Sequence, residues 1–323
     1  MSRILIIICG LLTLATWSCN QPFDPRGPLD KQLVVFCILT TDRDVQYVRV
    51  NSNYMPPGLD PYQYASDDAV RDASVTMGSS AGTWTFRDTV LANPIVTESS
   101  TYAYCLRSFR PTRGRTYWIL VKSPTFGVAS GVTVIPYAGI SYVSPGLTLF
   151  TQPFNLNPTV SVTMTIYPSS YTKGYATHLY LYYDVLKGSK WVEERVEIPE
   201  SSFVGRMPFD PDSTITVGLT ATPTNNVATL QYVAGELTSR IMYLTNQRYR
   251  TTHIFYKWLS FIVLSADQNL NSYYKAIQGF QDPLSLRLDQ PFFSSIDGGV
   301  GFVGSYSLDS MTVVLPGNFS GNK

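Results

Sequence analysis

The chain has 323 residues, with 24 basic and 23 acidic side chains and a formal net charge of +1. A charge this close to zero argues against a nucleic-acid-binding protein, because such proteins normally carry a basic excess. Charged residues make up 15% and hydrophobic residues 44% of the chain. This composition excludes a disordered protein and is typical of an exported β protein with uncharged polar outer faces.

The N-terminal stretch predicts export and lipid anchoring. Arg3 is followed by an apolar run over residues 4–14, which is too short for a permanent membrane helix of about 20 residues. We therefore predict that residues 1–18 are a lipoprotein signal peptide that is removed. Cys19 would then carry diacylglycerol and an N-acyl chain such as palmitate, which together anchor a protein stably. Ordinary cleavage that leaves Cys19 free is the alternative, because the bulky Trp17 departs from the usual lipoprotein pattern.

Residues 19–31 are predicted to be an extended tether, because they contain three prolines and no apolar periodicity. The length that follows suggests two domains or one large β domain. We place a first domain at 32–137 and a second at 138–316.

The first domain is predicted to be an antiparallel β-sandwich. Short apolar or alternating segments recur at regular spacing with turn residues between them. The turn that leads from Gly114 into Tyr117 is common in immunoglobulin-like and carboxypeptidase-regulatory-like modules. The loop at 53–68 is rich in proline and tyrosine, so it is either a binding surface or a tolerated insertion. The expected strands are 33–39, 45–50, 70–77, 82–90, 101–109, 115–123 and 131–136.

The second domain is predicted to be another sandwich with one short helix. Alternation in 177–186 places His178, Tyr180 and Tyr182 on one face of a strand. A helix is expected at about 266–278, with Ser265 and Gln268 as a capping box, packed on a sheet. The glycine-rich stretch at 291–316 predicts a tight bend or bulge that closes this domain. The other expected strands are 159–167, 191–199, 213–219, 239–245 and 255–265.

Two kinds of residue are candidates for a site or a crosslink. Outside the cytoplasm Cys37 and Cys105 could form a disulfide, or they are two buried free thiols in separate strands. Four arginines within nine residues are candidates for contact with lipid phosphates or an acidic partner. The alternative is a solvated hairpin tip. These arginines are Arg107, Arg110, Arg113 and Arg115.

The sequence offers little that predicts catalysis. The two histidines, His178 and His253, fall in different expected strands, with no cysteine pair or acidic partner at ligand spacing. No nucleophile-elbow motif accompanies either histidine, so a hydrolase is the less favoured reading. We therefore expect no catalytic residues, no metal site and no cofactor.

Several stretches resemble one family of lipoproteins. The strand LVVFCIL, the segments VRDASVTM and GRTYWILVKSP, and the later SADQNLNSYYKAIQ are similar to that family. SSIDGGVGFVGSYS resembles its closing glycine signature, with Ser295 in place of the usual Asn. The family comprises uncharacterised outer-membrane lipoproteins of Bacteroidetes-type bacteria, catalogued as a domain of unknown function. The resemblance implies an outer-membrane lipoprotein, often associated with import through energised barrels, and it implies no site residues.

Together these observations predict a non-enzymatic, surface-anchored lipoprotein with a mainly β fold. We expect it to be exported and held on the periplasmic or extracellular face of the outer membrane through Cys19. Its partners would be an outer-membrane barrel protein, as in a TonB-dependent transport system, or an extracellular ligand, and not a nucleic acid. A structural or adhesive envelope module is the alternative.

Overall fold

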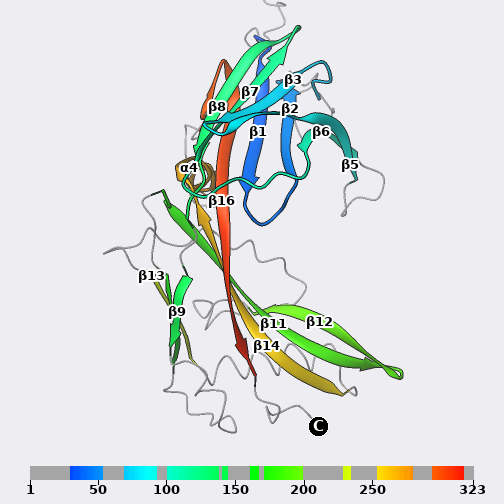
Figure 1. Cartoon of the computed structure of the whole chain (residues 1–323), viewed down its shortest axis with the longest axis vertical. Helices are drawn as coiled ribbons and strands as arrows, with labels where there is room; N and C mark the ends of the chain where they lie inside the picture. Colours follow the sequence, from blue (N-terminus) through cyan, green and yellow to red (C-terminus); the bar gives the residue numbers. More distant parts are fainter. Residues whose placement is uncertain are drawn as a thin grey trace, which may run out of the picture.

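A computed structural model gives the fold, which is mainly β with one short helix near the C-terminal end of the described chain (Figure 1). No helix in the described ranges is long and apolar enough to cross a membrane. The residues that the structure describes are 30–53, 69–92, 100–137, 140–144, 161–166, 171–198, 228–233, 253–278 and 293–315.

The first sheet has eight strands in the order β12-β11-β14-β16-β1-β2-β6-β5. Three neighbouring pairs, β11/β12, β1/β2 and β5/β6, are consecutive strands, whereas the other four pairs join segments that are distant in the sequence. The strands are β1 (Leu33–Thr40), β2 (Gln46–Ser52), β5 (Arg87–Ala92), β6 (Ser100–Leu106), β11 (Gly174–Lys187), β12 (Lys190–Ile198), β14 (Ile254–Ala266) and β16 (Gly299–Val314).

Two smaller sheets complete the β structure. The second sheet has the order β15-β8-β7-β3-β4, and the third has the order β13-β10-β9. The second sheet consists of β3 (Ser74–Ser79), β4 (Gly82–Thr85), β7 (Thr116–Ser123), β8 (Gly127–Val134) and β15 (Ile296–Asp297). The third consists of β9 (Ile140–Ser144), β10 (Ser161–Ile166) and β13 (Ala228–Val233).

The long strand β16 lies between β14 and β1 in the first sheet and pairs with both (Figure 1). Its first half pairs with β1 in parallel, from Leu33↔Gly299 to Thr40↔Tyr306. Its second half pairs with β14 in antiparallel fashion, from Ala266↔Tyr306 to Trp258↔Val314. The sheet is therefore mixed, whereas we had expected antiparallel pairing throughout. The parallel pair forms because the chain returns to β1 from a distant segment and not through a hairpin.

The pairing of β16 also concerns the expected division of the chain into two domains. β15 and the first half of β16 fall within 138–316, yet they pair with β8 and β1 of the 32–137 segment. The division at 137/138 stays a prediction, but this C-terminal stretch contributes strands on both sides of it.

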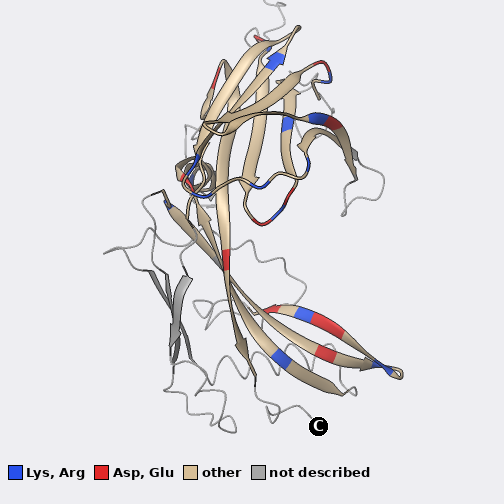
Figure 2. Ribbon diagram, in the orientation of Figure 1, with Lys and Arg blue, Asp and Glu red and all other residues tan. Residues whose placement is uncertain are grey.

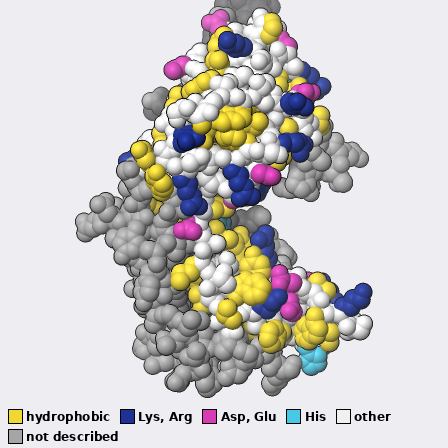
Figure 3. Space-filling model, viewed as in Figure 1, with side chains coloured by type: hydrophobic (Ala, Val, Ile, Leu, Met, Phe, Trp, Pro, Cys, Tyr) yellow, Lys and Arg dark blue, Asp and Glu magenta, His cyan; other side chains and the backbone are white. Residues whose placement is uncertain are grey.

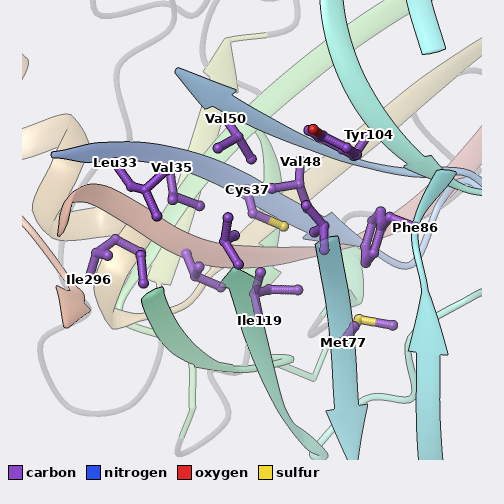
Figure 4. Packing of buried hydrophobic residues seen from close by; sticks show 14 of the residues in the cluster. Leu33, Val35, Cys37, Val48, Val50, Met77, Phe86, Tyr104, Ile119 and Ile296 are labelled. Atoms are coloured by element: carbon purple, nitrogen blue, oxygen red, sulfur yellow. The ribbon is translucent and has the colours of Figure 1, made fainter. Parts of the chain in front are cut away.

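The main described core lies between the first and second sheets (Figure 4). Alternate residues of β1 and β2 point toward the second sheet, as a half-buried strand requires. Val35 and Val48 meet Met77 and Ile119 in this core, and all four are almost fully buried. Burial of this apolar surface stabilises the two-sheet arrangement at roughly 25 cal/mol per Å².

The opposite face of β1 and β16 is covered by the helix α4 (Gln268–Gln278). The Tyr273 ring stacks on Phe302 with centroids 4.1 Å apart, and Phe36 packs edge-on against both rings. The prediction that the helix packs on a sheet is thereby confirmed. The helix covers this face of β1 only in part, since Ile38 is 38% exposed.

The helix begins at a different cap from the one expected. Asp267 is the N-cap, because its Oδ1 accepts a hydrogen bond of 2.8 Å from the backbone N–H of Leu270. The prediction of Ser265 as the capping residue is wrong. Ser265 is still part of β14, where it pairs with Ser307.

Chain crossings between the sheets explain two further features. The expected strand at 82–90 is two strands, because the chain passes at Phe86 from β4 in the second sheet to β5 in the first. Near the C-terminal end the chain crosses back at Gly298, whose φ of 75° lies in the left-handed region. The prediction of a tight glycine bend is confirmed at this corner.

The other expected strands meet mixed outcomes. Those at 33–39, 45–50, 101–109, 115–123, 177–186, 191–199 and 255–265 correspond to strands with bounds shifted by a few residues. Those at 70–77, 131–136 and 159–167 overlap β3, β8 and β10. The signal peptide, most of the tether, the loop at 53–68 and the strands at 213–219 and 239–245 lie outside the described residues.

Replacement of Gly301 by Ala tests the close approach of β16 to β1. Gly301 has a φ of 110°, and an added Cβ would lie 2.1 Å from the carbonyl oxygen of Val35. We expect Gly301→Ala to lower the free energy of unfolding by about 3 kcal/mol or more, since left-handed strain of about 1–2 kcal/mol adds to a backbone clash. Urea denaturation measures this loss.

Gly127→Ala is the matched control, because Gly127 also has a positive φ (85°) but nothing lies within 4 Å of its added Cβ. It should cost only about 1–2 kcal/mol. Equal losses in the two variants would contradict the steric role of Gly301.

Candidate binding site

The four arginines lie on the loop that joins β6 to β7, here called the arginine loop (residues 107–115). Its start is fixed by Ser108, which has a φ of 56°, and by the backbone N–H of Phe109, which donates to the carbonyl of Asp44 at 2.8 Å. The Phe109 ring then packs against Trp84, with centroids 4.6 Å apart, and against Tyr117. The loop is thus attached to the core at its first turn.

The second half of the loop is held by backbone and tyrosine hydrogen bonds. The buried Tyr117 hydroxyl accepts a bond of 2.9 Å from the N–H of Thr112. The N–H of Gly114 donates to the carbonyl of Ile135 at 2.8 Å, and Gly114 has a φ of 76°. An added Cβ there would lie 2.1 Å from the hydroxyl oxygen of Tyr137, so only glycine fits.

The arginine side chains fall into two groups. Arg107, Arg110 and Arg113 are exposed and Arg115 is half-buried, and of the four only Arg113 and Arg115 line the depression described below. Arg113 donates from Nη2 to the carbonyl of Leu308 in β16 at 2.8 Å. Figure 2 shows the basic residues along this loop. The depression has a volume of about 400 Å³ and is lined by Ser80, Thr112, Arg113, Gly114, Arg115, Thr116 and Tyr137.

A second surface is formed by the outward face of β11 with its neighbours β12 and β14, here called the aromatic face. Its residues are His178, Tyr180, Tyr182, Asp184, Glu193, Arg195, Glu197, Lys257 and Trp258. The predicted alternation of His178, Tyr180 and Tyr182 is confirmed by this register. Hydrophobic and charged side chains are mixed over the lower part of Figure 3.

The rings of the aromatic face are partly covered by cations of the same sheet. Tyr182 stacks on Trp258 with centroids 5.3 Å apart. The Arg195 guanidinium lies 5.0 Å from the Tyr180 centroid, and the Lys257 ammonium lies 4.6 Å from that of Trp258. Such cation–π contacts stabilise the sheet surface, so these rings offer less free area than their number suggests.

The carboxylates of this region are bound to basic partners. Glu193 forms an ion pair with Lys257, which also lies 3.5 Å from Asp184. Glu194 points to the other face, where it pairs with Lys187 at 2.6 Å. The neighbouring glutamates therefore do not act together, as alternation along a strand requires. The other sequence pairs, at 67/68 and 210/212, lie outside the described residues.

The two histidines lie in different surroundings. His178 Nδ1 lies 2.6 Å from Oε1 of Glu197, across β11 and β12, so it does have an acidic neighbour. Within the described ranges no serine or cysteine side chain bonds to His178. His253 precedes β14, where its carbonyl accepts from the N–H of Leu186. The described residues contain no cluster of three His, Cys, Asp or Glu side chains that could hold a metal.

Cys37 and Cys105 are buried free thiols, so they do not form the disulfide that was one of the two possibilities. Cys37 is opposite Val48, and Val48 is opposite Tyr104, so these three side chains share one face of the sheet. Cys105 is the neighbour of Tyr104 and points to the other face. A disulfide needs Cα atoms within about 7 Å and facing Cβ atoms, which residues two strands apart on opposite faces cannot provide. Burial also raises the pKa of the Cys37 thiol.

A buried polar cluster joins β8, α4 and β16, and it was not predicted. The Thr133 hydroxyl lies 2.5 Å from Oδ2 of Asp267 and 2.7 Å from Oγ of Ser305, and Ser305 donates to the carbonyl of Val134. Three contacts need three hydrogens, and the two hydroxyls supply only two. A protonated Asp267 would supply the third.

The environment of Asp267 agrees with this count of hydrogens. Its side chain is almost fully buried, and this desolvation raises the pKa of Asp267 above its ordinary value, although hydrogen bonds from Thr133 and the backbone oppose the rise.

Sequence reasoning found the arginines but missed the rest of the depression. Ser80 comes from the β3–β4 turn and Tyr137 follows β8, so both reach the site through sheet pairing. The available signal was the Gly114–Tyr117 turn, which places Arg115 at a fixed backbone position. Nothing in the sequence singles out Tyr137 from the other tyrosines.

Comparisons with known proteins add little to this geometry. No protein-family model matches the chain, and no curated protein matches it. Among solved structures, the chain is similar to the C-terminal globular domain of an oligosaccharyltransferase from Pyrococcus abyssi, at 7% sequence identity and a TM-score of 0.18. The match covers 91% of this chain and 52% of that one, so the chain spans about half its length. A TM-score this low carries no argument about fold or function.

Two substitutions at Asp267 test the protonated cap. Asp267→Asn keeps an oxygen for Leu270 and an N–H for Thr133, so at pH 7 we expect it to be at least as stable as the parent. Asp267→Ala removes both and should lower the free energy of unfolding by about 1–3 kcal/mol. Urea denaturation at several pH values measures both.

The sign of the pH dependence follows from the raised pKa of Asp267. The parent should lose stability as pH rises through the folded-state pKa, because the folded state resists ionisation. The advantage of Asp267→Asn over the parent should therefore grow with pH across that range. A loss in Asp267→Asn as large as that in Asp267→Ala would refute a protonated side chain.

Proposed function

We propose that this chain is an exported, lipid-anchored outer-membrane protein that binds a partner or ligand and catalyses no reaction. The observation that carries the proposal is the short apolar run over residues 4–14, which is followed by Cys19 and then by a proline-rich segment. A diacylated cysteine of this kind holds a protein on a bilayer, since two chains give stable anchoring where one does not.

We propose further that the two packed sheets are an immunoglobulin-like sandwich. Support comes from Tyr117, whose hydroxyl accepts from the N–H of Thr112 five residues upstream, as in the tyrosine corner of that fold. The second segment is proposed to be a sandwich as well. Leu181, Phe261 and Val263 on the inner face of β11 and β14 are fully buried, so a second layer must cover them.

A binding role fits the described surfaces better than a catalytic one. His178 and Glu197 could move a proton, but they lie on exposed strands beside paired charges and no described nucleophile bonds to the imidazole. The depression at the arginine loop instead gathers hydrogen-bond donors around a fixed backbone. Loops held by a rigid sheet are where binding sites commonly lie.

The proposed setting is an accessory to an energised transport barrel of the TonB-dependent kind, on the periplasmic or extracellular face of the membrane. This part of the proposal rests on the resemblance to outer-membrane lipoproteins. The second candidate is a structural or adhesive envelope module, which the exposed Tyr137 and Tyr171 and the mixed charged and aromatic face of β11 favour equally.

Metabolic labelling tests the anchor. Cells that express the full chain are grown with a clickable palmitate analogue, and the purified protein is probed for label. We expect label on the parent chain and none on Cys19→Ala, which should also move from the membrane to the soluble fraction. Cys37→Ala is the control, because that thiol is buried in the core and should not affect labelling. An unlabelled parent chain would refute the anchor.

Co-purification tests the transport setting. The tagged lipoprotein is isolated from detergent-solubilised membranes, and recovered partners are identified by mass spectrometry against a mock purification. A large β-barrel protein is the expected partner. Recovery of the lipoprotein alone, together with a deletion strain that takes up nutrients normally but attaches poorly to surfaces, would favour the adhesive alternative.

A further inference from the structure

The depression beside the arginine loop combines three kinds of group that can contact a polar ligand. Arg113 and Arg115 supply guanidinium donors, and Ser80, Thr112 and Thr116 supply hydroxyls. Tyr137 supplies an aromatic wall that is 48% exposed. None of the lining residues that the structure describes is acidic, so no described side chain of the depression neutralises the positive charge. Its volume of about 400 Å³ falls in the range of small-ligand sites.

The donors of the two arginines are largely uncommitted. Arg113 uses one of its five N–H groups on the carbonyl of Leu308, which fixes the side chain and leaves the others available. Arg115 is half-buried, and its guanidinium makes no hydrogen bond or ion pair with another residue in the described part of the chain. A planar guanidinium with free donors suits a carboxylate, sulfate or phosphate group, which it binds through two parallel hydrogen bonds.

The backbone of the site is organised before any ligand arrives. The N–H groups of Gly114 and Arg115 bond to Ile135 and Thr112, and the N–H of Ile135 bonds back to Arg115. The Tyr137 ring rests on Gly114, where a side chain would collide with it. A site held in this way loses little conformational freedom on binding, which favours affinity.

Tyr137 does not stand alone as an aromatic surface. The Tyr171 ring lies with its centroid 6.2 Å away at an interplanar angle of 30°, and it is 42% exposed. Two exposed rings beside hydroxyl and guanidinium donors match a ligand with flat C–H faces, many hydroxyls and a negative group. The chemistry of such a ligand is that of an anionic sugar.

We propose that this depression binds an anionic saccharide, with Arg113 and Arg115 on its acidic group and Tyr137 against a sugar ring. The proposal rests on the binding role given above and names the ligand class for it. The acidic group is a uronate carboxylate or a sugar phosphate, which share the same oxyanion chemistry. Arg107 and Arg110 take no part, because they do not line the depression.

Isothermal titration calorimetry on the purified full chain tests the proposal. The probes are trigalacturonate, glucose 6-phosphate, a neutral galactose trisaccharide and inorganic phosphate. We expect at least one anionic sugar to bind about tenfold or more tightly than both the neutral sugar and inorganic phosphate. The better of the two anionic sugars identifies the acidic group.

Matched variants locate the binding. Arg115→Gln should weaken the anionic sugar about tenfold, since it removes a charge-assisted contact. Arg110→Gln removes the same charge from the same loop outside the depression and should change affinity less than twofold. Thr116→Val removes a lining hydroxyl without changing charge and should weaken binding severalfold, while thermal midpoints of all variants show that they fold.

Three results would overturn the proposal. These are no binding of either anionic sugar, equal binding of inorganic phosphate, or equal losses in Arg115→Gln and Arg110→Gln. None of them bears on the anchor at Cys19, because binding in solution does not need the lipid. Conversely, an unlabelled Cys19 would leave these titrations unaffected.

Discussion

The fold depends on one strand that pairs with two partners of opposite direction. β16 runs parallel to β1 over its first half and antiparallel to β14 over its second half, and the change of partner falls at Tyr306. At that point β14 ends, α4 begins, and the polar cluster of Thr133, Asp267 and Ser305 fills the space between helix and sheets. The corner at Gly298 then lets the same chain join the second sheet through β15. The two halves of the described chain are therefore tied together by hydrogen bonds along a single strand, not by a linker.

The sequence predicted most of the described strands because their signal is local. Alternation in 115–123 and 177–186 follows directly from one face being buried, and it needs no knowledge of the partner strand. Pairing is different, because no residue of LVVFCIL indicates that its parallel neighbour lies more than 250 positions away, at Gly299–Tyr306. The same limit explains why the break at Phe86 was not predicted. Phe86 is buried between the two sheets, and its backbone N–H donates to the carbonyl of Val75 in β3. The residues next to Phe86 indicate neither contact. The cap was misassigned because Ser265 and Asp267 are both good capping residues, and only the length of β14 decides between them.

The candidate site was predictable in part for the same reason. Four arginines in nine residues mark a basic loop, but the choice of Arg113 and Arg115 over their neighbours depends on which way the turn at Gly114 points them. Tyr137 and Ser80 come from other loops and enter only through the pairing of β3, β7 and β8. For Cys37 and Cys105 the sequence left a disulfide open, and only the register of the strands excludes it, because the two thiols lie on opposite faces of the sheet.

Acidic and basic residues are nearly equal in number over the whole chain, but they are distributed unevenly over its surface. On the outward face of β11, β12 and β14 the charges are paired with one another: Lys257 contacts Glu193, and His178 contacts Glu197. Exposed pairs of this kind add little to stability, about 0–1 kcal/mol each. In the arginine loop the cations lack such partners among the described residues, and the loop is held in shape by backbone and tyrosine hydrogen bonds instead. A fixed loop with unpaired cations is not required by the fold, because any residue with the right backbone would satisfy those bonds. On our proposal, Arg113 and Arg115 serve to bind a ligand rather than to stabilise the loop.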